Sequence, residues 1–162
     1  MSHDDHQNVF DLFPEETSTE TEGELTTSQL GRYAEFMVCA ELTKLGYYVQ
    51  HCDAPGFDVI LVVEKRSLRV QVKSTSSVKE GRCYWTCSKC RYSDRDMNNR
   101  GRRAIDKSDA DLIALYHHVF GTTIYILPED IRTATGGICL PVTQVREHGD
   151  SESLDHALRR IL

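Results

Sequence analysis

Residues 56–74 read GFDVILVVEKRSLRVQVKS, and this stretch decides the fold. Two runs of aliphatic residues flank the polar segment 64–67, a pattern that predicts a β-hairpin with a buried face. Three polar side chains, Asp58, Gln71 and Lys73, interrupt the apolar strands. The first question that the sequence raises is therefore whether these three groups meet.

A turn centred on residues 65–66 would place Asp58 directly opposite Lys73 in the hairpin. Because side chains alternate across a strand, Asp58, Gln71 and Lys73 would then share one face, and a slip of one residue would separate them. One interpretation is a cross-strand ion pair between Asp58 and Lys73, with Gln71 incidental. The other is a site for a hard cation, in which the lysine orients water or offsets negative charge.

The other segments predict two helices and several strands around this hairpin. Thr26 and Gln29 have the spacing of a capping box, and Gly46 is well placed to end the helix that follows. Strands are expected at 47–52, 82–90, 110–119, 122–128 and 136–142, and an amphipathic helix at 151–162. The predicted fold class is α/β, with a central mixed, largely antiparallel sheet flanked by helices.

Length and composition favour one ordinary domain in a chain of 162 residues. Residues 1–25 are acidic and poor in apolar groups, which predicts a disordered tail, and residues 26–162 form the expected single domain. No segment approaches the roughly 20 apolar residues of a membrane span, and the N-terminus lacks an apolar signal sequence. We therefore expect a cytoplasmic protein without a membrane partner.

The charge is distributed unevenly, although the net charge is −6. Residues 1–29 contain eight acidic and no basic residues, whereas residues 65–107 contain thirteen basic and four acidic ones. A basic segment inside an acidic protein indicates a surface that binds a polyanion. The alternative is a solvated basic surface without a partner.

Three ordered motifs resemble those of the PD-(D/E)XK nuclease superfamily: GRYAE at 31–35, GFD at 56–58 and QVKS at 71–74. The resemblance spans roughly residues 28–142, and it includes the later segment DADLIALYHHVFGTTIYILPED. Within the superfamily, the sequence is similar to group I intron homing endonucleases and, more distantly, to archaeal Holliday-junction resolvases. Phe57 stands where the name-giving proline of the motif is found.

This resemblance implies an endonuclease that uses Mg²⁺ or Mn²⁺ and has four catalytic residues, Glu35, Asp58, Gln71 and Lys73. Asp58, Glu35, Gln71 and the backbone carbonyl of Val72 would bind the metal. Gln71 occupies a position that usually holds Asp or Glu, and its neutral amide is expected to weaken metal affinity. The homing-endonuclease subgroup has Gln-Val-Lys at this place, so the substitution is compatible with activity.

The basic segment is expected to hold the DNA backbone, because arginine and lysine on loops suit phosphate contacts. The candidate residues are Lys79, Arg82, Arg91, Arg95, Arg100, Arg102 and Arg103. The expected function is site-specific cleavage of double-stranded or branched DNA, of homing type first and of junction-resolvase or restriction type next. A homo-oligomer, dimer or tetramer, is also expected. The alternative function is a catalytically inactive nucleic-acid-binding module on the same fold.

A third hypothesis comes from Cys83, Cys87 and Cys90, whose C-x3-C-x2-C spacing can hold an iron–sulfur cluster. A zinc site would need a fourth ligand, for which Cys139 or His51 is available. We favour ordinary thiols, because the three cysteines lie in a strand-like stretch of a short chain.

Overall fold

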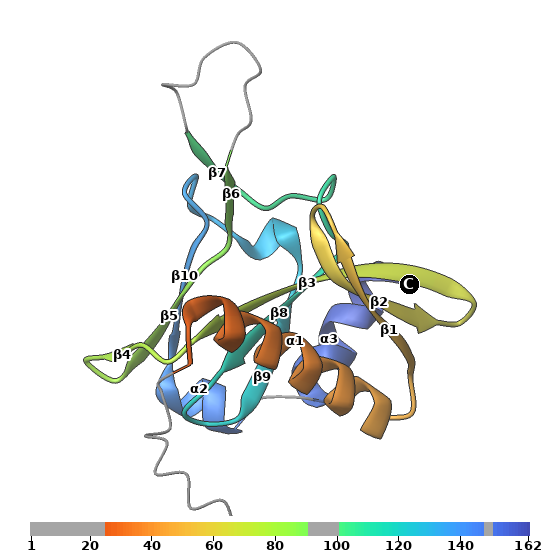
Figure 1. Cartoon of the computed structure of the whole chain (residues 1–162), viewed down its shortest axis with the longest axis horizontal. Helices are drawn as coiled ribbons and strands as arrows, with labels where there is room; N and C mark the ends of the chain where they lie inside the picture. Colours follow the sequence, from red (N-terminus) through yellow and green to blue (C-terminus); the bar gives the residue numbers. More distant parts are fainter. Residues whose placement is uncertain (1–24, 91–100, 148–150) are drawn as a thin grey trace, which may run out of the picture.

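A five-stranded sheet lies at the centre of the structure, a computed structural model that describes residues 25–90, 101–147 and 151–162 (Figure 1). The strand order is β1-β2-β3-β8-β9. β3 and β8 run parallel, and the other neighbours run antiparallel. The predicted mixed, largely antiparallel sheet is thus confirmed. Its strands are β1 (Tyr48–Ala54), β2 (Phe57–Val63), β3 (Arg66–Thr75), β8 (Leu112–His117) and β9 (Thr122–Ile126).

The turn between β2 and β3 is tighter than the sequence predicts. Val63 pairs with Arg66, so only Glu64 and Lys65 lie in the turn, with φ angles of 47° and 68°. Positive φ at both positions is typical of a type I′ turn, whose twist matches that of the flanking strands. The usual sequence signal for this turn is Asn-Gly, so the Glu-Lys sequence does not predict it.

The predicted register of this hairpin was therefore wrong by two residues. Val59 pairs with Val70, which places Asp58 beside Gln71 and not opposite Lys73. Because side chains alternate with a period of two, a shift of two residues leaves the faces unchanged. Asp58, Gln71 and Lys73 consequently share one face of the sheet, as predicted, but in a different order.

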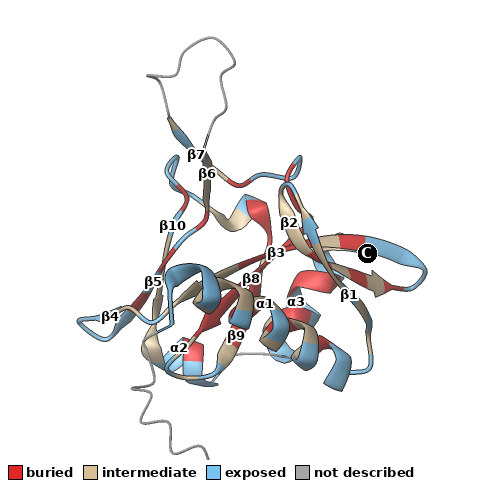
Figure 2. Ribbon diagram, in the orientation of Figure 1, coloured by how far each residue is buried: buried red, intermediate tan, exposed pale blue. Residues whose placement is uncertain are grey.

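Two helices, α1 (Thr27–Lys44) and α3 (Ser151–Ile161), pack on one face of the sheet (Figures 1 and 2). The predicted capping box is present at the start of α1, where Thr26 and Gln29 bond reciprocally. The apolar sides of both helices are buried against β2, β3 and β8. The helical core residues are Ala34, Val38, Leu42, Leu154, Ala157 and Leu158.

A second layer covers the opposite face of the sheet. It contains a three-stranded sheet of order β10-β5-β4 and the short helix α2 (Val142–Glu147). Trp85 and Cys83 of this layer are buried with Ile113 and Leu115 of β8. Its strands are β4 (Val78–Lys79), β5 (Arg82–Thr86) and β10 (Gly137–Pro141), and the sequence did not predict β4 or α2.

The single strand predicted over 82–90 is divided at Cys87. β5 ends at Thr86, and β6 (Ser88–Cys90) pairs with β7 (Arg102–Ala104) in a separate ribbon that projects from the domain (Figure 1). The Cys87 N–H bonds to the Gly136 carbonyl, and the Cys87 carbonyl accepts from Ile105. Cys87 thus bonds to two different segments, at the point where the chain leaves the sheet of β5 and enters the ribbon of β6 and β7.

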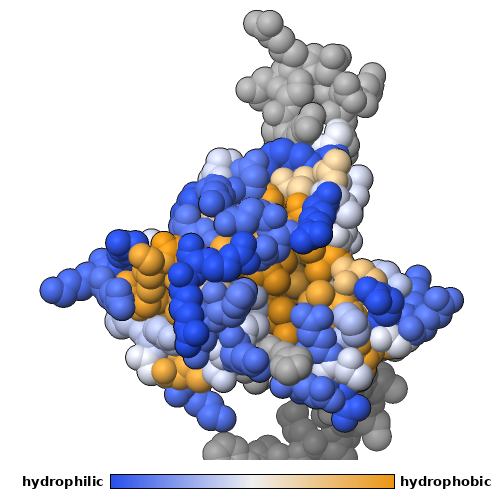
Figure 3. All heavy atoms as spheres, turned by 180° about the vertical axis from the view of Figure 1, so that it is seen from behind, coloured by the Kyte–Doolittle hydropathy of each residue, from blue (hydrophilic) through white to orange (hydrophobic). Residues whose placement is uncertain are grey.

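The rear surface is largely hydrophilic, with apolar side chains visible between the polar ones (Figure 3). Within the described ranges, no helix has the length and apolar character needed to cross a membrane. The predicted acidic tail falls almost wholly outside the described residues. The 3₁₀ turn Pro128–Asp130 and the loop before β10 complete the described chain.

Candidate active site

Asp58 lies where the pairing between β2 and β3 ends. The last paired residues at this end of the ladder are Val59 and Val70. Beyond them, the Val72 N–H donates to the Asp58 Oδ2 atom at 2.7 Å, and the Gln71 amide nitrogen donates to the same oxygen. The Asp58 carboxylate therefore replaces the backbone acceptor that a continued strand would supply.

The Val72 carbonyl lies on the same side of β3 as Asp58. The carbonyls of Arg69 and Thr75 accept hydrogen bonds from backbone N–H groups at the two ends of β8. Backbone groups alternate in direction along a strand, so even-numbered residues of β3 direct theirs toward β2. The Val72 carbonyl thus lies on the Asp58 side of β3, 3.4 Å from the Gln71 amide nitrogen.

The environment of Asp58 favours a nearby cation. Burial raises the pKa of Asp58, and the negative charge of Glu35 raises it further. The hydrogen bond from Val72 and the positive charges of Lys73 and His51 act in the opposite direction but do not cancel the increase. A cation between the two carboxylates would stabilise both in their ionised form.

Glu35, from α1, belongs to a compact polar cluster beside Asp58. The Glu35 Oε2 atom lies 2.7 Å from His51 Nε2 and 3.1 Å from Arg32 Nη1. The same Arg32 nitrogen lies 2.6 Å from Asp53 Oδ1 and 2.9 Å from His51 Nε2. Glu35, His51 and Asp53 offer ligand atoms within 4.8 Å of one another, and the Arg32 guanidinium occupies the space among them.

The sequence did not place Arg32, His51 and Asp53 in this cluster, and it indicated His51 only as a possible zinc ligand. Arg32 was detectable in principle, because it precedes Glu35 by three residues and so shares its side of the helix. His51 and Asp53 gave no comparable signal. Their positions depend on β1, whose pairing with β2 shifts register between His51 and Ala54.

Gln71 and Lys73 of β3 lie on the same face of the sheet as Ile113 and Leu115, their partners in β8. Gln71 is buried, and its amide nitrogen holds the Asp58 carboxylate. Its metal-ligand role stays a prediction, because such a role would use the amide oxygen. Lys73 is half-buried and close enough to Asp58 for its charge to lower the pKa of that carboxyl.

Residues 25–154 match the family model described as PD-(D/E)XK endonuclease. The chain belongs to this family. The predicted resemblance is thereby confirmed. The matched region contains all four motif residues: Glu35, Asp58, Gln71 and Lys73.

Solved structures of two nucleases resemble this PD-(D/E)XK endonuclease. The bacterial homing endonuclease I-Ssp6803I is 23% identical, with a TM-score of 0.64 over 85% of this chain and 94% of its own. The Holliday junction resolvase Hjc of Archaeoglobus fulgidus is 16% identical, with a TM-score of 0.46 over 79% of this chain and 95% of its own. No curated protein matches the sequence significantly. The first likeness supports the fold.

The proposed DNA-binding residues of the PD-(D/E)XK endonuclease are only partly described. Lys79, Arg82 and Arg102 are exposed on β4, β5 and β7. Arg103 is engaged inside the protein, because its guanidinium donates two hydrogen bonds to Asp109 at 2.6 and 2.8 Å. Three further candidates lie outside the described residues: Arg91, Arg95 and Arg100.

Two of the clustered cysteines are core residues of this endonuclease. Cys83 and Cys87 are buried in the second layer, and burial raises the pKa of both thiols, to about 12 for Cys87. The Cys90 side chain lies outside the described part of the structure. Cys139 differs, because a hydrogen bond from Arg82 lowers its pKa.

Proposed function

We propose that this PD-(D/E)XK endonuclease is a divalent-metal-dependent DNA endonuclease that cleaves at specific sites. The observation that carries the proposal is the Asp58 carboxylate, which the Val72 N–H fixes where the pairing of β2 and β3 ends. Glu35 contributes a second negative charge there, and Lys73 contributes a positive one. Carboxylates can hold a metal that activates water, and a lysine can offset the negative charge that develops in phosphodiester hydrolysis.

The residues around Asp58 fit a hard divalent cation. Asp58, Glu35 and the Val72 carbonyl offer oxygen atoms, which Mg²⁺ and Mn²⁺ prefer as ligands. The Arg32 guanidinium already pairs with Glu35 and Asp53, so an ion bound to Glu35 would share or displace that contact. When bound, the ion would polarise a phosphodiester oxygen and acidify a coordinated water.

The protein's own residues would orient the reacting groups. The Val72 N–H and the Gln71 amide hold Asp58 in one orientation, so its carboxylate needs little reorganisation. Lys73, on the same face, would hydrogen-bond the attacking water or offset the charge that develops on the phosphate. The exposed residues Lys79, Arg82 and Arg102 would contact the DNA backbone.

The finer assignments rest on sequence resemblance and charge. A homing-type enzyme acting on double-stranded DNA is the first subtype, and a junction resolvase or a restriction-type enzyme is the next. We propose that residues 26–162 act as one nuclease domain and that the protein assembles as a homo-oligomer, since a symmetric site suits symmetric subunits. The rival function is an inactive nucleic-acid-binding module.

The full-length protein should be incubated with supercoiled plasmid, linear duplex, four-way junction and RNA, with Mg²⁺ or with EDTA. Because an enzyme of this type is site-specific, the plasmid should carry the genomic region that surrounds the reading frame. Cleavage of one DNA form that EDTA abolishes is the expected result. Salt-sensitive binding of DNA, without cleavage of any form, would instead favour the binding module.

Lys73→Met is expected to reduce the cleavage rate by about 10²- to 10³-fold, the effect of removing one preorganised charge from a transition state. DNA affinity should change far less, since one lysine among many contributes little to binding. Single-turnover cleavage and equilibrium binding measure the two effects separately. The matched control is Lys65→Met in the β2–β3 turn, at the other end of the hairpin. Equal losses in both variants would contradict the assignment.

Gln71→Glu is expected to destabilise the protein without metal, because a second buried carboxylate would face Asp58. Mg²⁺ should then raise the unfolding temperature of this variant more than that of the wild type. Thermal unfolding with and without Mg²⁺ measures the difference. Gln144→Glu, the same change at an exposed position of α2, is the control. An identical Mg²⁺ effect in wild type and Gln71→Glu would show that position 71 does not contact the ion.

A further inference from the structure

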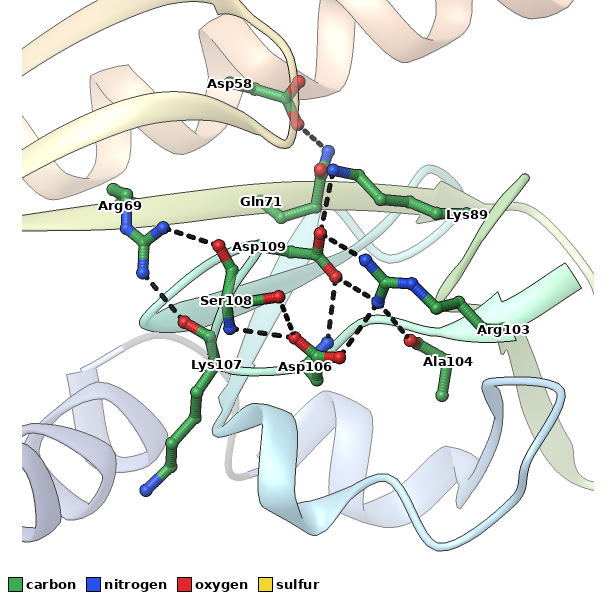
Figure 4. Close-up of polar contacts among 10 residues, drawn as sticks. All are labelled: Asp58, Arg69, Gln71, Lys89, Arg103, Ala104, Asp106, Lys107, Ser108 and Asp109. Carbon is green, nitrogen blue, oxygen red and sulfur yellow. Dashed lines mark hydrogen bonds and ion pairs between the residues drawn. The ribbon is translucent and has the colours of Figure 1, made fainter. Parts of the chain in front are cut away.

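A second lysine, Lys89 of β6, lies against the turn that leads into Asp58. A Cβ atom added to Gly56, two residues before Asp58, would lie 2.7 Å from the Lys89 amino nitrogen. Two residues of strand span roughly 7 Å, so this amino group is near the candidate active site. In the view of Figure 4, the Lys89 amino group lies next to the Gln71 side chain and is joined to Asp109, with Asp58 above Gln71.

Asp109 fixes the position of this lysine. The Asp109 side chain is 7% exposed, and its Oδ1 atom lies 3.0 Å from the Lys89 amino group. Burial by itself would raise the pKa of Asp109, but hydrogen bonds from Arg103, the Asp106 N–H and Lys89 outweigh it. The pKa of Asp109 is therefore held well below its usual range, and the carboxylate is ionised at neutral pH.

The contact with Asp109 leaves the positive charge of Lys89 able to attract a ligand. Asp109 already receives two shorter hydrogen bonds from Arg103, at 2.6 and 2.8 Å, which offset its negative charge. The Lys89 side chain remains 28% exposed, and an ammonium group has three donors, of which Asp109 takes one. Among the described residues, Asp109 is the one hydrogen-bond partner of the Lys89 amino group, so this group keeps donors for a ligand that approaches from solvent.

We propose that Lys89 contacts a DNA phosphate beside the scissile one and that Asp109 is the residue that positions it. This inference rests on the proposed function, because it assumes a DNA substrate. A lysine suits such a contact, since it acts as a point charge toward a phosphate. Through Arg103 of β7, the same Asp109 carboxylate also ties both strands of the projecting ribbon to the catalytic end of the sheet (Figure 4).

The test is the salt dependence of DNA binding by the full-length protein, measured in EDTA with a 30-base-pair duplex as the probe. Lys89→Met is expected to lower affinity roughly five- to tenfold near 0.1 M salt, and to reduce the slope of log K against log salt by about 0.9. Lys89→Gln should give the same slope while keeping a donor for Asp109. The control is Lys107→Met, because Lys107 is also ion-paired, to Glu129 at 3.3 Å.

A purely structural lysine would lower the unfolding temperature of the Lys89 variants and leave the slope at the wild-type value, which would overturn the proposal. If Lys107→Met reduces the slope as much as Lys89→Met does, the contact is not specific to Lys89 and the proposal also fails. Wild-type protein that neither binds nor cleaves any DNA would instead refute the proposed function, and this inference with it.

Discussion

Asp58→Asn is expected to reduce the proposed Mg²⁺-dependent DNA cleavage by about 10³-fold or more, because the proposed metal contact of Asp58 would be worth several kcal/mol, which corresponds to that factor. The asparagine oxygen can still accept the Val72 N–H, so the local backbone should keep its conformation. What disappears is the negative charge beside Glu35. Single-turnover cleavage at saturating protein measures the loss, and Asp155→Asn on the exposed surface of α3 is the matched control.

Stability distinguishes this effect from misfolding. The pKa of Asp58 is raised in the folded protein, chiefly by burial, so the ionised carboxylate destabilises the fold at neutral pH. The free energy of unfolding of Asp58→Asn should therefore equal or exceed that of the wild type, and the difference should grow as the pH rises from about 4. A variant that keeps cleavage within tenfold of the wild type would remove Asp58 from the active site.

Asp109→Asn is expected to lower the free energy of unfolding by about 2–4 kcal/mol, because it leaves two cations without their shared carboxylate. This value lies below that of a fully buried pair, since the side chains of Lys89 and Arg103 keep 28% and 30% of their surface exposed. Urea unfolding measures the change. The control is Asp106→Asn, which removes the more exposed partner of Arg103 and should have a smaller effect.

The effect of Asp109 should depend on pH in a defined direction. The folded-state pKa of this carboxyl is lowered, so its stabilising contribution is complete above the unfolded value of about 4 and is lost as the pH falls below it. The difference in unfolding free energy between wild type and Asp109→Asn should shrink over that acid range. A difference that stays constant from neutral to acid pH would show that the ion pairs do not stabilise the fold.

The arrangement of Asp58, Gln71 and Lys73 on one face was predictable because strand periodicity is insensitive to a register error of two. The exact pairing was not, because the tight Glu64–Lys65 turn has no characteristic residues. Glu35 was predictable from its motif on an amphipathic helix. These features follow from the periodicity of one strand or one helix, which can be read directly from the sequence.

The residues that the sequence did not reveal depend on tertiary placement. His51 and Asp53 meet Arg32 only because β1 lies at the edge of the sheet beside α1. Asp109 resembles an ordinary loop carboxylate in the sequence, and its burial follows from the ribbon of β6 and β7 that packs against it. Neither arrangement leaves a periodic pattern along the chain.

The Arg32 guanidinium offsets the negative charge of its neighbours without a metal. Because it sits among Glu35, His51 and Asp53, these groups have an internal counter-ion before any metal arrives. If the proposed metal binds here, the domain would not need it in order to fold, unlike small metal-dependent domains that are unfolded without their ion. The same guanidinium would compete with the proposed cation for Glu35, and it would thereby lower the affinity of the site for that ion.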